Sequence, residues 1–320
     1  MQQLKATACR LFLITLLIAV FAQAHDAQKE EQGQLPRIVA MGDLHGDLAN
    51  TLAIMKHTGL VDDQGHWAGG NTIFVQTGDV VDRGVDTIKL YQLLDRLEEE
   101  ARAQGGQVVR TLGNHEIMNM IGDWRYVHPD DIRSFGGQEA RMHAFSEDGW
   151  IGKVLLELNL TAKVGSSVFC HGGIHPIFAL DGGVDKINEN TRSTLREYVK
   201  PRGDHRKDPY GLYGGHGPTW YRGYAMDKES EVCPLLDQAL ELIGADRMVM
   251  GHTVQRNGRI TTRCNGKAVL IDIGISHVYG GHFGALEIID DQELFATYKH
   301  GREPLLPSRE PDPVFIHEEL

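Results

Sequence analysis

Five short, glycine-flanked segments of this chain carry side chains that can bind metal ions. They cover residues 42–46, 78–84, 113–116, 170–173 and 251–253, and the first three directly follow apolar runs typical of buried strands. Together they supply six oxygen or imidazole donors: Asp43, His45, Asp79, Asn114, His171 and His252. Buried carboxylates and imidazoles without partners are costly, so donors repeated at successive strand ends indicate a binding site.

The mixture of donors suits particular ions and a particular reaction. Alone, the pair Asp43 and His45 is explained more simply as a helix cap beside a surface histidine, but the repetition of donors favours a metal centre. Two Asp, three His and one Asn suit Mn, Fe or Zn better than Ca or Mg. Two such ions activate a bridging water for in-line attack at phosphorus. We therefore expect a bridging hydroxide to hydrolyse a phosphate ester without a covalent intermediate.

The same motifs resemble a known family. GDLHGD, GDVVDRG, GNHE, HGG and GH are similar to the signature of the calcineurin-like metallophosphoesterase superfamily, in the branch of the phosphoprotein phosphatases. The resemblance covers residues 37 to 298, and HGGIHP, GPTWYRGY (217–224) and IDIGISHVYGG (271–281) resemble the Shewanella-like protein phosphatases. It implies an α/β fold, a metallophosphatase sandwich of two mixed β-sheets flanked by helices, with a dimetal site at the carboxyl ends of strands.

The resemblance also implies which residue binds which metal. Asp43 and His45 would bind the first ion, and Asp79 would bridge both ions. The second ion would be completed by three residues from later motifs: Asn114, His171 and His252.

Four further residues receive roles in catalysis from the resemblance. His115 would be the general acid that protonates the leaving oxygen, oriented by Asp82. Arg83 and Arg222 would bind the phosphoryl oxygens, because a guanidinium group offers paired hydrogen bonds to them. We expect Glu116 to orient a histidine or an asparagine rather than to bind metal.

The elements around the first three motifs predict a parallel sheet. Strands are expected at 37–41, 72–77 and 107–112, and helices at 48–57, at 85–104 and from His115 onward. A β-α-β-α-β order implies parallel strands with ligands at their carboxyl ends, where the motifs lie.

The second half of the chain has a different pattern. Its expected strands are 167–170, 247–250, 268–273, 285–289 and 293–298, the last three antiparallel. A helix is expected at 234–243, beginning near Pro234. Residues 122–150 and 181–230 lack periodicity, and the second stretch is interpreted as a loop-rich cap over the site.

The two ends of the chain predict its location. Basic residues, an apolar run (11–21) and Ala22-Gln23-Ala24 predict a signal peptide over residues 1–24, too short to span a bilayer. A flexible segment (25–35), a catalytic domain (36–300) and a tail (301–320) would follow. The tail ends in HEEL, similar to luminal retention signals. We expect the lumen of the endoplasmic reticulum, or the periplasm if the source is bacterial.

Charge and cysteine usage restrict the partners. A net charge of -12 argues against binding nucleic acid or an anionic membrane surface. Cys233 and Cys264 could pair, which the sequence leaves open, as it does the oligomeric state.

The expected substrate is a phosphoprotein, with phosphotyrosine slightly favoured over phosphoserine and phosphothreonine. A dinucleoside tetraphosphate hydrolase or a small-molecule phosphomonoesterase is the alternative on the same scaffold. A non-catalytic binding module is a third possibility, against which the complete set of Asp82, Arg83 and His115 argues.

Overall fold

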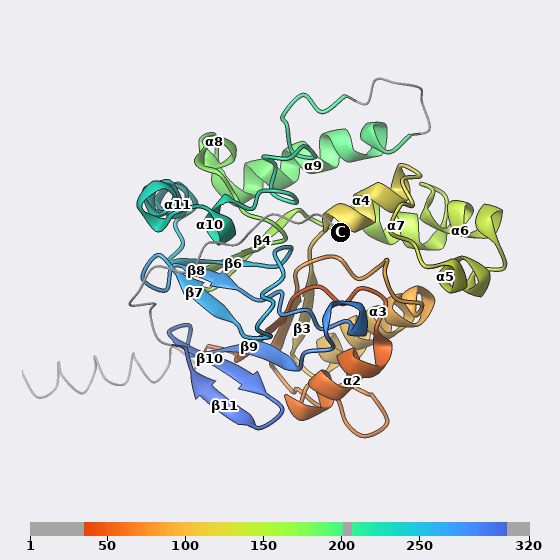
Figure 1. The fold of residues 1–320 in the computed structure, drawn as a ribbon, viewed down its shortest axis with the longest axis horizontal. Coiled ribbons are helices and arrows are strands. Elements are labelled where there is room, and N and C mark those ends of the chain that lie inside the picture. Colours follow the sequence, from red (N-terminus) through yellow and green to blue (C-terminus); the bar gives the residue numbers. More distant parts are fainter. Residues whose placement is uncertain (1–34, 201–206, 306–320) are drawn as a thin grey trace, which may run out of the picture. The chain divides into compact units, whose positions relative to one another are not determined.

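Two mixed β-sheets flanked by helices form the fold (Figure 1), which confirms the predicted α/β sandwich. The structure is a computed structural model and describes residues 35–200 and 207–305. The first sheet has six strands in the order β11-β10-β9-β1-β2-β3. These strands are β1 (Ile38–Met41), β2 (Ile73–Gln76), β3 (Gln107–Arg110), β9 (Gly284–Ile289), β10 (Glu293–Tyr298) and β11 (Gly301–Pro304).

The parallel half of this sheet follows the prediction. Strands β1, β2 and β3 pair in parallel, so their carboxyl ends lie at one edge. Strands β9 and β10 form an antiparallel pair with β9 beside β1. Strand β11 adds an antiparallel edge where the sequence suggested a polar tail. The sheet therefore extends past residue 300, because backbone hydrogen bonds to β10 need no apolar side chains.

The second sheet has five strands in the order β4-β5-β6-β8-β7. Strand β8 was expected to be antiparallel, but it runs parallel to β6 and antiparallel only to β7. The short edge strand β7 reverses the chain, which brings β8 back alongside β6 in the same direction. The strands are β4 (Thr161–Val164), β5 (Ser167–Cys170), β6 (Arg247–Met250), β7 (Thr261–Arg263) and β8 (Ala268–Leu270).

Three helices follow the parallel strands, as predicted. They are α2 (Leu48–His57), α3 (Thr87–Ala103) and α4 (Asn114–Met120). The Asp47 side chain caps α2 by accepting a hydrogen bond from the Asn50 backbone N–H. Gly59 lies beyond the end of α2 with φ 69°, a conformation that favours glycine. Helix α3 packs against β3 (Figure 1).

The two stretches without periodicity contain several helices along with their loops, and the sequence did not predict these helices. Their amino-acid pattern is weak because several helices are short and bury polar side chains, such as Arg141 of α6 and Asn188 of α9. Helix α11 begins at Glu229 rather than near Pro234, which lies within it. The helices of this half are α5 (Pro129–Ser134), α6 (Gln138–Phe145), α7 (Trp150–Glu157), α8 (Pro176–Ala179), α9 (Gly183–Tyr198), α10 (Gly223–Met226), α11 (Glu229–Ile243) and the 3-10 helix η1 (His277–Tyr279).

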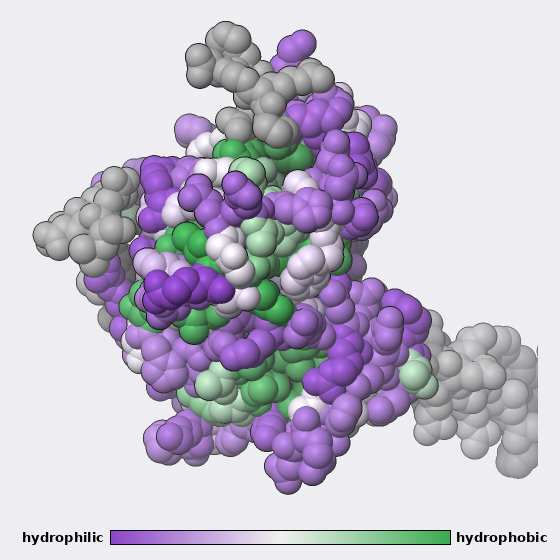
Figure 2. Space-filling view, turned by 90° about the vertical axis from the view of Figure 1, so that its right-hand side faces the viewer, coloured by the Kyte–Doolittle hydropathy of each residue, from purple (hydrophilic) through white to green (hydrophobic). Residues whose placement is uncertain are grey.

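One face of the molecule is mainly polar. Hydrophilic side chains cover most of the face drawn in Figure 2, with apolar ones in patches between them. None of the helices in residues 35–200 and 207–305 is long and apolar enough to cross a membrane. The expected signal peptide, residues 25–34 and the HEEL sequence lie outside the described residues.

Candidate metal centre

The structure brings all six predicted metal donors together at the carboxyl ends of strands from both sheets. Asp43 and His45 follow β1, Asp79 follows β2, and Asn114 begins α4 after β3. The other two donors follow β5 and β6 of the second sheet: His171 and His252. Each of the six residues is at most 5% exposed.

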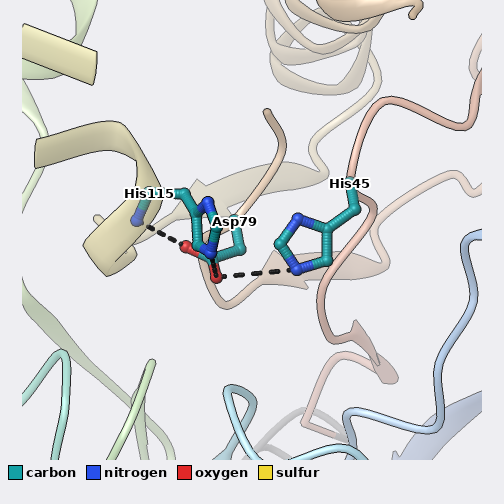
Figure 3. Close-up of side chains that lie close together, drawn as sticks. All are labelled: His45, Asp79 and His115. Atoms are coloured by element: carbon teal, nitrogen blue, oxygen red, sulfur yellow. Dashed lines mark hydrogen bonds and ion pairs between the residues drawn. The ribbon is translucent and has the colours of Figure 1, made fainter. Parts of the chain in front are cut away.

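Asp79 lies at the middle of the cluster. Its Oδ2 atom is 3.1 Å from Nε2 of His171 and 3.8 Å from Nε2 of His45. It is also 3.8 Å from Nε2 of His115, which projects from the start of α4 (Figure 3). Asp79 belongs to two groups of residues whose ligand atoms lie within 4.8 Å of one another. One group contains His45 and His115, and the other contains His171 and His252. These groups are close enough to share metal ions.

The remaining donors complete the two sides of this cluster. Asp43 Oδ2 is 3.8 Å from Nε2 of His45, and its Oδ1 accepts a hydrogen bond from the His252 backbone N–H at 3.0 Å. Asn114 Oδ1 is 2.8 Å from Nε2 of His171. The rings of His171 and His252 are 4.8 Å apart between centroids.

Backbone carbonyls orient two of the histidines. His45 Nδ1 is 2.9 Å from the Val81 carbonyl oxygen, and His171 Nδ1 is 2.8 Å from that of Thr77. A carbonyl only accepts, so each Nδ1 carries the proton and donates it. In the neutral form of each ring, Nε2 is then unprotonated and faces the cluster, as a metal ligand requires.

The loops that carry these residues adopt backbone conformations that are rare outside glycine. Five site residues have positive φ: His45 (41°), Asp79 (56°), Asp82 (69°), Arg83 (67°) and His252 (65°). Each such residue costs on the order of 1–3 kcal/mol and persists only where its surroundings fix it. Here the loops after β1 and β2 hold each other, because the Leu44 and His45 N–H groups both donate to the Asp79 carbonyl at 2.9 and 3.0 Å. The donors are thus positioned by the backbone.

Two glycines, Gly46 and Gly84, allow the loops after β1 and β2 to approach each other this closely. A Cβ atom on Gly84 would lie 2.5 Å from the carbonyl oxygens of His45 and Gly46. Real Cβ atoms do not approach a backbone oxygen so closely, so only glycine allows the two loops to meet here.

The electrostatics of the cluster favour a bound cation. Burial raises the pKa of Asp43 well above its usual value, and the neighbouring carboxylates of Asp272 and Asp79 raise it further. Burial also raises the pKa of Asp272 to about 6. Burial opposes ionisation of Asp79 as well, but His171 and His115 hold the pKa of Asp79 well below its usual value. Three buried carboxylates beside imidazoles form a donor set that fits metal ions.

His115 and Asp82 form a buried pair beside the cluster. His115 Nδ1 is 2.6 Å from Asp82 Oδ2, and the His115 backbone N–H donates to Asp79 Oδ1 at 3.0 Å. Burial lowers the pKa of His115, but Asp79 and Asp82 outweigh it, and the net pKa is raised. The Nε2 atom of His115 therefore faces the centre on a ring that holds a proton readily.

The two predicted phosphate-binding arginines are placed differently. The guanidinium carbon of Arg83 is 4.1 Å from the ring centroid of Tyr126 and 5.5 Å from that of Tyr279. Arg83 Nε is buried, and no hydrogen-bond partner for it lies within the described ranges. Arg222 is exposed and donates from Nη1 to the His252 carbonyl oxygen at 2.6 Å. Arg222 thus lies next to a metal donor, and Arg83 is held by aromatic rings.

A family model for calcineurin-like phosphoesterases matches residues 36–256, which contain all six donors together with His115, Asp82 and both arginines. The chain belongs to this family. Among curated proteins, Shewanella-like protein phosphatase 2 of Arabidopsis thaliana is 35% identical, over 75% of this chain and 71% of its own length. Shewanella-like protein phosphatase 1 of Plasmodium berghei is 33% identical, over 82% of this chain and 74% of its own.

A solved structure is also similar. The cold-active protein-tyrosine phosphatase of a psychrophilic Shewanella species matches with a TM-score of 0.74 and 28% identity, covering 85% of this chain and 80% of that one. The chain is therefore a phosphatase of the metallophosphoesterase family, and its substrates are phosphate esters.

Some residues around the centre of this phosphoesterase were not found from the sequence. Asp272 is buried two residues after the end of β8, and the apolar run that it follows was the available signal. Glu116 was expected to orient a histidine or an asparagine, but it accepts hydrogen bonds from backbone N–H groups instead. Its carboxylate accepts the backbone N–H groups of Asp79 (2.8 Å), Val80 (2.8 Å) and Gly113 (2.9 Å), and so fixes the turn that carries Asp79.

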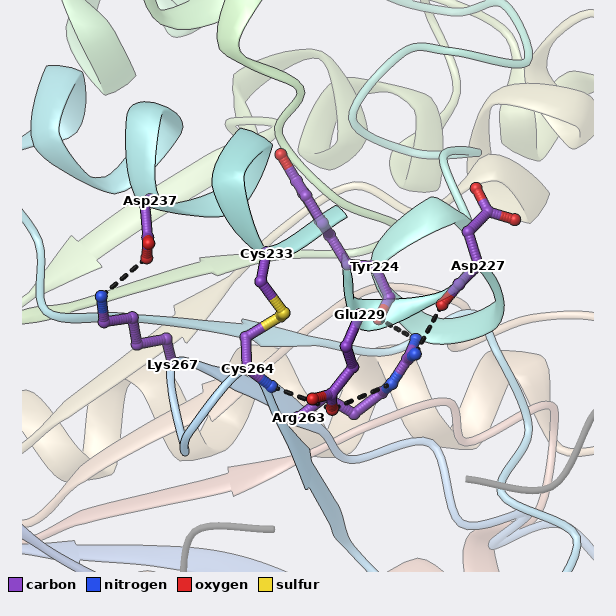
Figure 4. Close-up of a disulfide and its surroundings, with 8 residues drawn as sticks. All are labelled: Tyr224, Asp227, Glu229, Cys233, Asp237, Arg263, Cys264 and Lys267. Atoms are coloured by element: carbon purple, nitrogen blue, oxygen red, sulfur yellow. Dashed lines mark hydrogen bonds and ion pairs between the residues drawn. A yellow bond between two sulfur atoms is a disulfide. The ribbon is translucent and has the colours of Figure 1, made fainter. Parts of the chain in front are cut away.

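A disulfide lies behind the segment of the phosphoesterase that carries Arg222. Cys233 of α11 is bonded to Cys264, which follows β7 (Figure 4). The neighbouring Arg263 donates to the Tyr224 carbonyl oxygen at 2.6 Å and to that of Asp227 at 2.5 Å. Both contacts fasten α10, which begins directly after Arg222, to the second sheet.

Proposed function

We propose that this enzyme is a dimetal protein phosphatase that hydrolyses phosphomonoesters, and that it prefers phosphotyrosine to phosphoserine or phosphothreonine. The observation that carries the proposal is the convergence of metal donors and His115 around Asp79, with Arg83 held by Tyr126 and Tyr279, the two rings next to His115 and His45. Donors alone would serve many hydrolyses. A proton donor and a phosphate-binding guanidinium beside them favour phosphoryl chemistry.

The residues that would hold the metals belong to both sheets. Asp43 and His45 would bind one ion, and Asp79 would bridge to the other. The second ion would be completed by Asn114, His171 and His252. Two ions of Mn, Fe or Zn bound there would supply an activated water and stabilise negative charge on the phosphoryl group.

Arg83 and Arg222 would bind the phosphoryl oxygens. Arg83 presents a guanidinium whose Nε lacks a protein partner among the described residues, while Tyr126 and Tyr279 fix its plane. Arg222 is anchored through one nitrogen to the His252 carbonyl. Its other donors are thereby placed beside the second group of metal ligands.

His115 would protonate the leaving oxygen. Asp82 accepts a hydrogen bond from Nδ1, which leaves the Nε2 proton facing the centre. Burial lowers the pKa of His115, but Asp79 and Asp82 outweigh it and raise the pKa, which favours the protonated ring that a general acid needs when the P–O bond breaks.

Two aromatic rings support the preference for phosphotyrosine. The ring centroid of Tyr126 is 5.1 Å from that of His115, and Tyr279 lies 5.1 Å from His45. A phenyl leaving group next to His115 would pack against Tyr126, whereas a serine or threonine side chain is too small to do so. The similar Shewanella structure, which is described as a protein-tyrosine phosphatase, supports the same preference.

A substrate comparison tests the proposal. The metal-reconstituted enzyme would be assayed on matched phosphotyrosine and phosphothreonine peptides and on diadenosine tetraphosphate. We expect the highest kcat/KM on the phosphotyrosine peptide. Cleavage of the dinucleotide without activity on either peptide would instead identify a dinucleoside tetraphosphate hydrolase.

Replacing the proposed general acid tests its role. His115→Asn should lower kcat on an alkyl phosphate about 10²–10⁴-fold, the usual contribution of a general acid. The metal content, measured by mass spectrometry, should stay unchanged, because His115 is not among the proposed ligands. Loss of metal together with activity would show that His115 is a ligand instead.

We also propose that the protein works in an oxidising compartment, the lumen of the endoplasmic reticulum in a eukaryote or the periplasm in a bacterium. The bonded pair Cys233 and Cys264 supports this, because structural disulfides persist where thiols are oxidised. Thiol labelling of the protein from its native source should modify these cysteines only after reduction. Labelling without a reductant would place the protein in a reducing compartment.

A further inference from the structure

A chain of buried polar groups continues behind the pair formed by His115 and Asp82. While Asp82 Oδ2 lies against His115, its Oδ1 accepts a hydrogen bond from Asn119 Nδ2 at 2.8 Å. The same Asn119 Nδ2 also donates to the His115 carbonyl oxygen at 2.9 Å. Asn119 lies one turn after His115 on α4 and therefore contacts both members of the pair.

Arg141 is the next member of this chain. It belongs to α6 and is 0% exposed. Its Nη1 donates to Asn119 Oδ1 at 2.5 Å, and its Nε donates to Asp131 Oδ2 at 3.0 Å. Its Nη2 lies 3.6 Å from Asp82 Oδ1. The charges of the four ionisable groups alternate when His115 is protonated: His115, Asp82, Arg141 and Asp131.

Aromatic rings restrict where the guanidinium can lie. Its carbon is 4.7 Å from the ring centroid of Phe145, 5.2 Å from that of Trp124 and 5.4 Å from that of Phe135. These rings and Asp131 come from residues 124–145, the stretch that showed no periodicity in the sequence. This segment thus encloses Arg141 and aims it at Asn119.

The hydrogen-bond chemistry determines the direction of the whole chain. A guanidinium donates only, so Asn119 must turn its oxygen toward Arg141 and its NH₂ group toward Asp82. With Asn119 reversed, its oxygen would face a carboxylate oxygen. Because Oδ1 of Asp82 is occupied in this way, Oδ2 remains for Nδ1 of His115. A buried ion pair adds little stability over apolar residues of similar size, so a specific role explains Arg141 better.

We propose that Arg141 is a positioning residue for the general acid: it fixes the Asn119 amide, which holds Asp82, which in turn keeps Nε2 of His115 directed at the leaving oxygen. The proposal rests on the proposed role of His115. It assigns to helices α5 and α6 a part in catalysis although they supply no group that touches substrate.

Esters with different leaving groups separate positioning from general structural damage. A poor leaving group such as phenol depends on protonation more than p-nitrophenol, which departs readily as an anion. Arg141→Met should lower kcat/KM for phenyl phosphate about 10–100-fold and that for p-nitrophenyl phosphate less than about 3-fold, part of the usual general-acid effect. The dependence of rate on the leaving group should therefore become steeper. Arg141→Lys should restore part of the loss on phenyl phosphate, because its ammonium can still donate to Asn119.

A matched control removes another buried arginine. Arg110 has a side chain only 7% exposed and pairs with Asp95 at 2.7 Å and Glu98 at 2.8 Å, without contact to Asp82. Arg110→Met should leave the ratio of the two ester rates unchanged. Equal losses on both esters in Arg141→Met, or the same change of ratio in Arg110→Met, would overturn the proposal.

Two further variants keep the test decisive. If Arg141→Met does not fold, the double variant Asp131→Leu/Arg141→Met replaces the ion pair by apolar groups, and the same steeper dependence is expected. An unchanged dependence of rate on the leaving group in the folded double variant would overturn the proposal.

His115→Asn provides the reference. If it steepens the dependence and Arg141→Met does not, only the positioning role fails; if His115→Asn has no such effect, the proposed general acid is wrong.

Discussion

At the scale of single residues, the centre buries three carboxylates, and two of them resist ionisation. Asp43, Asp79 and Asp272 are each at most 2% exposed. The pKa of Asp43 is raised well above its usual value and that of Asp272 to about 6, in both cases first by burial. The metal-free protein therefore keeps Asp43 and Asp272 in an environment that disfavours their charge, and this has a measurable effect on stability.

Asp272 makes the metal-free protein less stable as the pH rises. Its pKa is about 6 when folded, against 3.8 for the unfolded chain, so the folded state binds the extra proton between these values. The associated stability is fully present below pH 3.8 and is lost as the pH rises through about 6, by on the order of 3 kcal/mol. Asp272→Asn should remove this loss. Chemical unfolding of chelated protein at pH 4.5 and pH 8 measures it, and an equal pH effect in both proteins would contradict the assignment.

Tyr126 provides a second test at this scale. Tyr126→Leu removes the ring that would pack on the phenyl group of phosphotyrosine, which is worth about 0.5–1.5 kcal/mol. We expect kcat/KM for the phosphotyrosine peptide to fall about 3–10-fold relative to the phosphothreonine peptide. Tyr210→Leu, at an exposed tyrosine outside the ring contacts of the centre, is the control. A parallel fall on both peptides would show that Tyr126 acts on Arg83 rather than on the substrate.

The site residues that could be predicted from the sequence differ from those that could not in how far apart along the chain their partners lie. Asp43, His45 and Asp79 stand beside glycines at strand ends, so local pattern alone marks them. Arg141 acquires its role from Asn119, 22 residues earlier in the chain. Only the tertiary packing of α4 against α6 brings the two together, and no local spacing records that contact.

At the scale of elements, helices with an apolar buried face were predicted, and helices with a partly polar buried face were not. Helix α3 buries an apolar face that includes Leu90, Leu94 and Leu97, so its periodicity is visible in the sequence. Helix α5 buries Asp131 and α6 buries Arg141, so their inward faces are partly polar. Patterns of apolar residues do not show a helix whose buried side is an ion pair.

Helix α10 and the segment with Arg222 are fastened in two independent ways. The disulfide joins α11 to the turn after β7, while Arg263 bonds the carbonyls of Tyr224 and Asp227. Glu229, at the start of α11, also accepts the Cys264 backbone N–H at 3.1 Å. The polar contacts therefore hold the position of Arg222 even without the sulfur bridge.

Removing the disulfide should accordingly affect stability more than substrate binding. Cys233→Ala/Cys264→Ala opens a bridge across 31 residues, which should lower the free energy of unfolding by about 3 kcal/mol. KM should change less than about 2-fold, because Arg263 and Glu229 still anchor the segment. Thermal unfolding and steady-state kinetics measure the two effects. A large rise in KM at unchanged melting temperature would show that the bridge itself positions Arg222.

At the scale of the whole catalytic unit, the centre lies where the two sheets meet. The first sheet supplies Asp43, His45 and Asp79, along with Asn114, and the second supplies His171 and His252. The carbonyl oxygen of Thr77, directly after β2 of the first sheet, also accepts a hydrogen bond from His171 at 2.8 Å. Ions bound here would link the ends of both sheets, so occupancy of the centre should be coupled to the stability of the entire unit.

Chelation should therefore lower the melting temperature, and by more at high pH. Ions at about 1,000 times their dissociation constant stabilise the folded state by about 4 kcal/mol per site, and this is lost when they are removed. Protons compete for the ligands, and Asp43, with its raised pKa, is among the first to take one as the pH falls. The melting temperatures with and without chelator should differ most near pH 8 and converge toward pH 5.

The melting temperature of Asp79→Asn should be nearly insensitive to chelator at both pH values, while the surface control Asp95→Asn should behave like the parent. If the parent melts identically with and without chelator at pH 8, the centre does not couple the two sheets through metal.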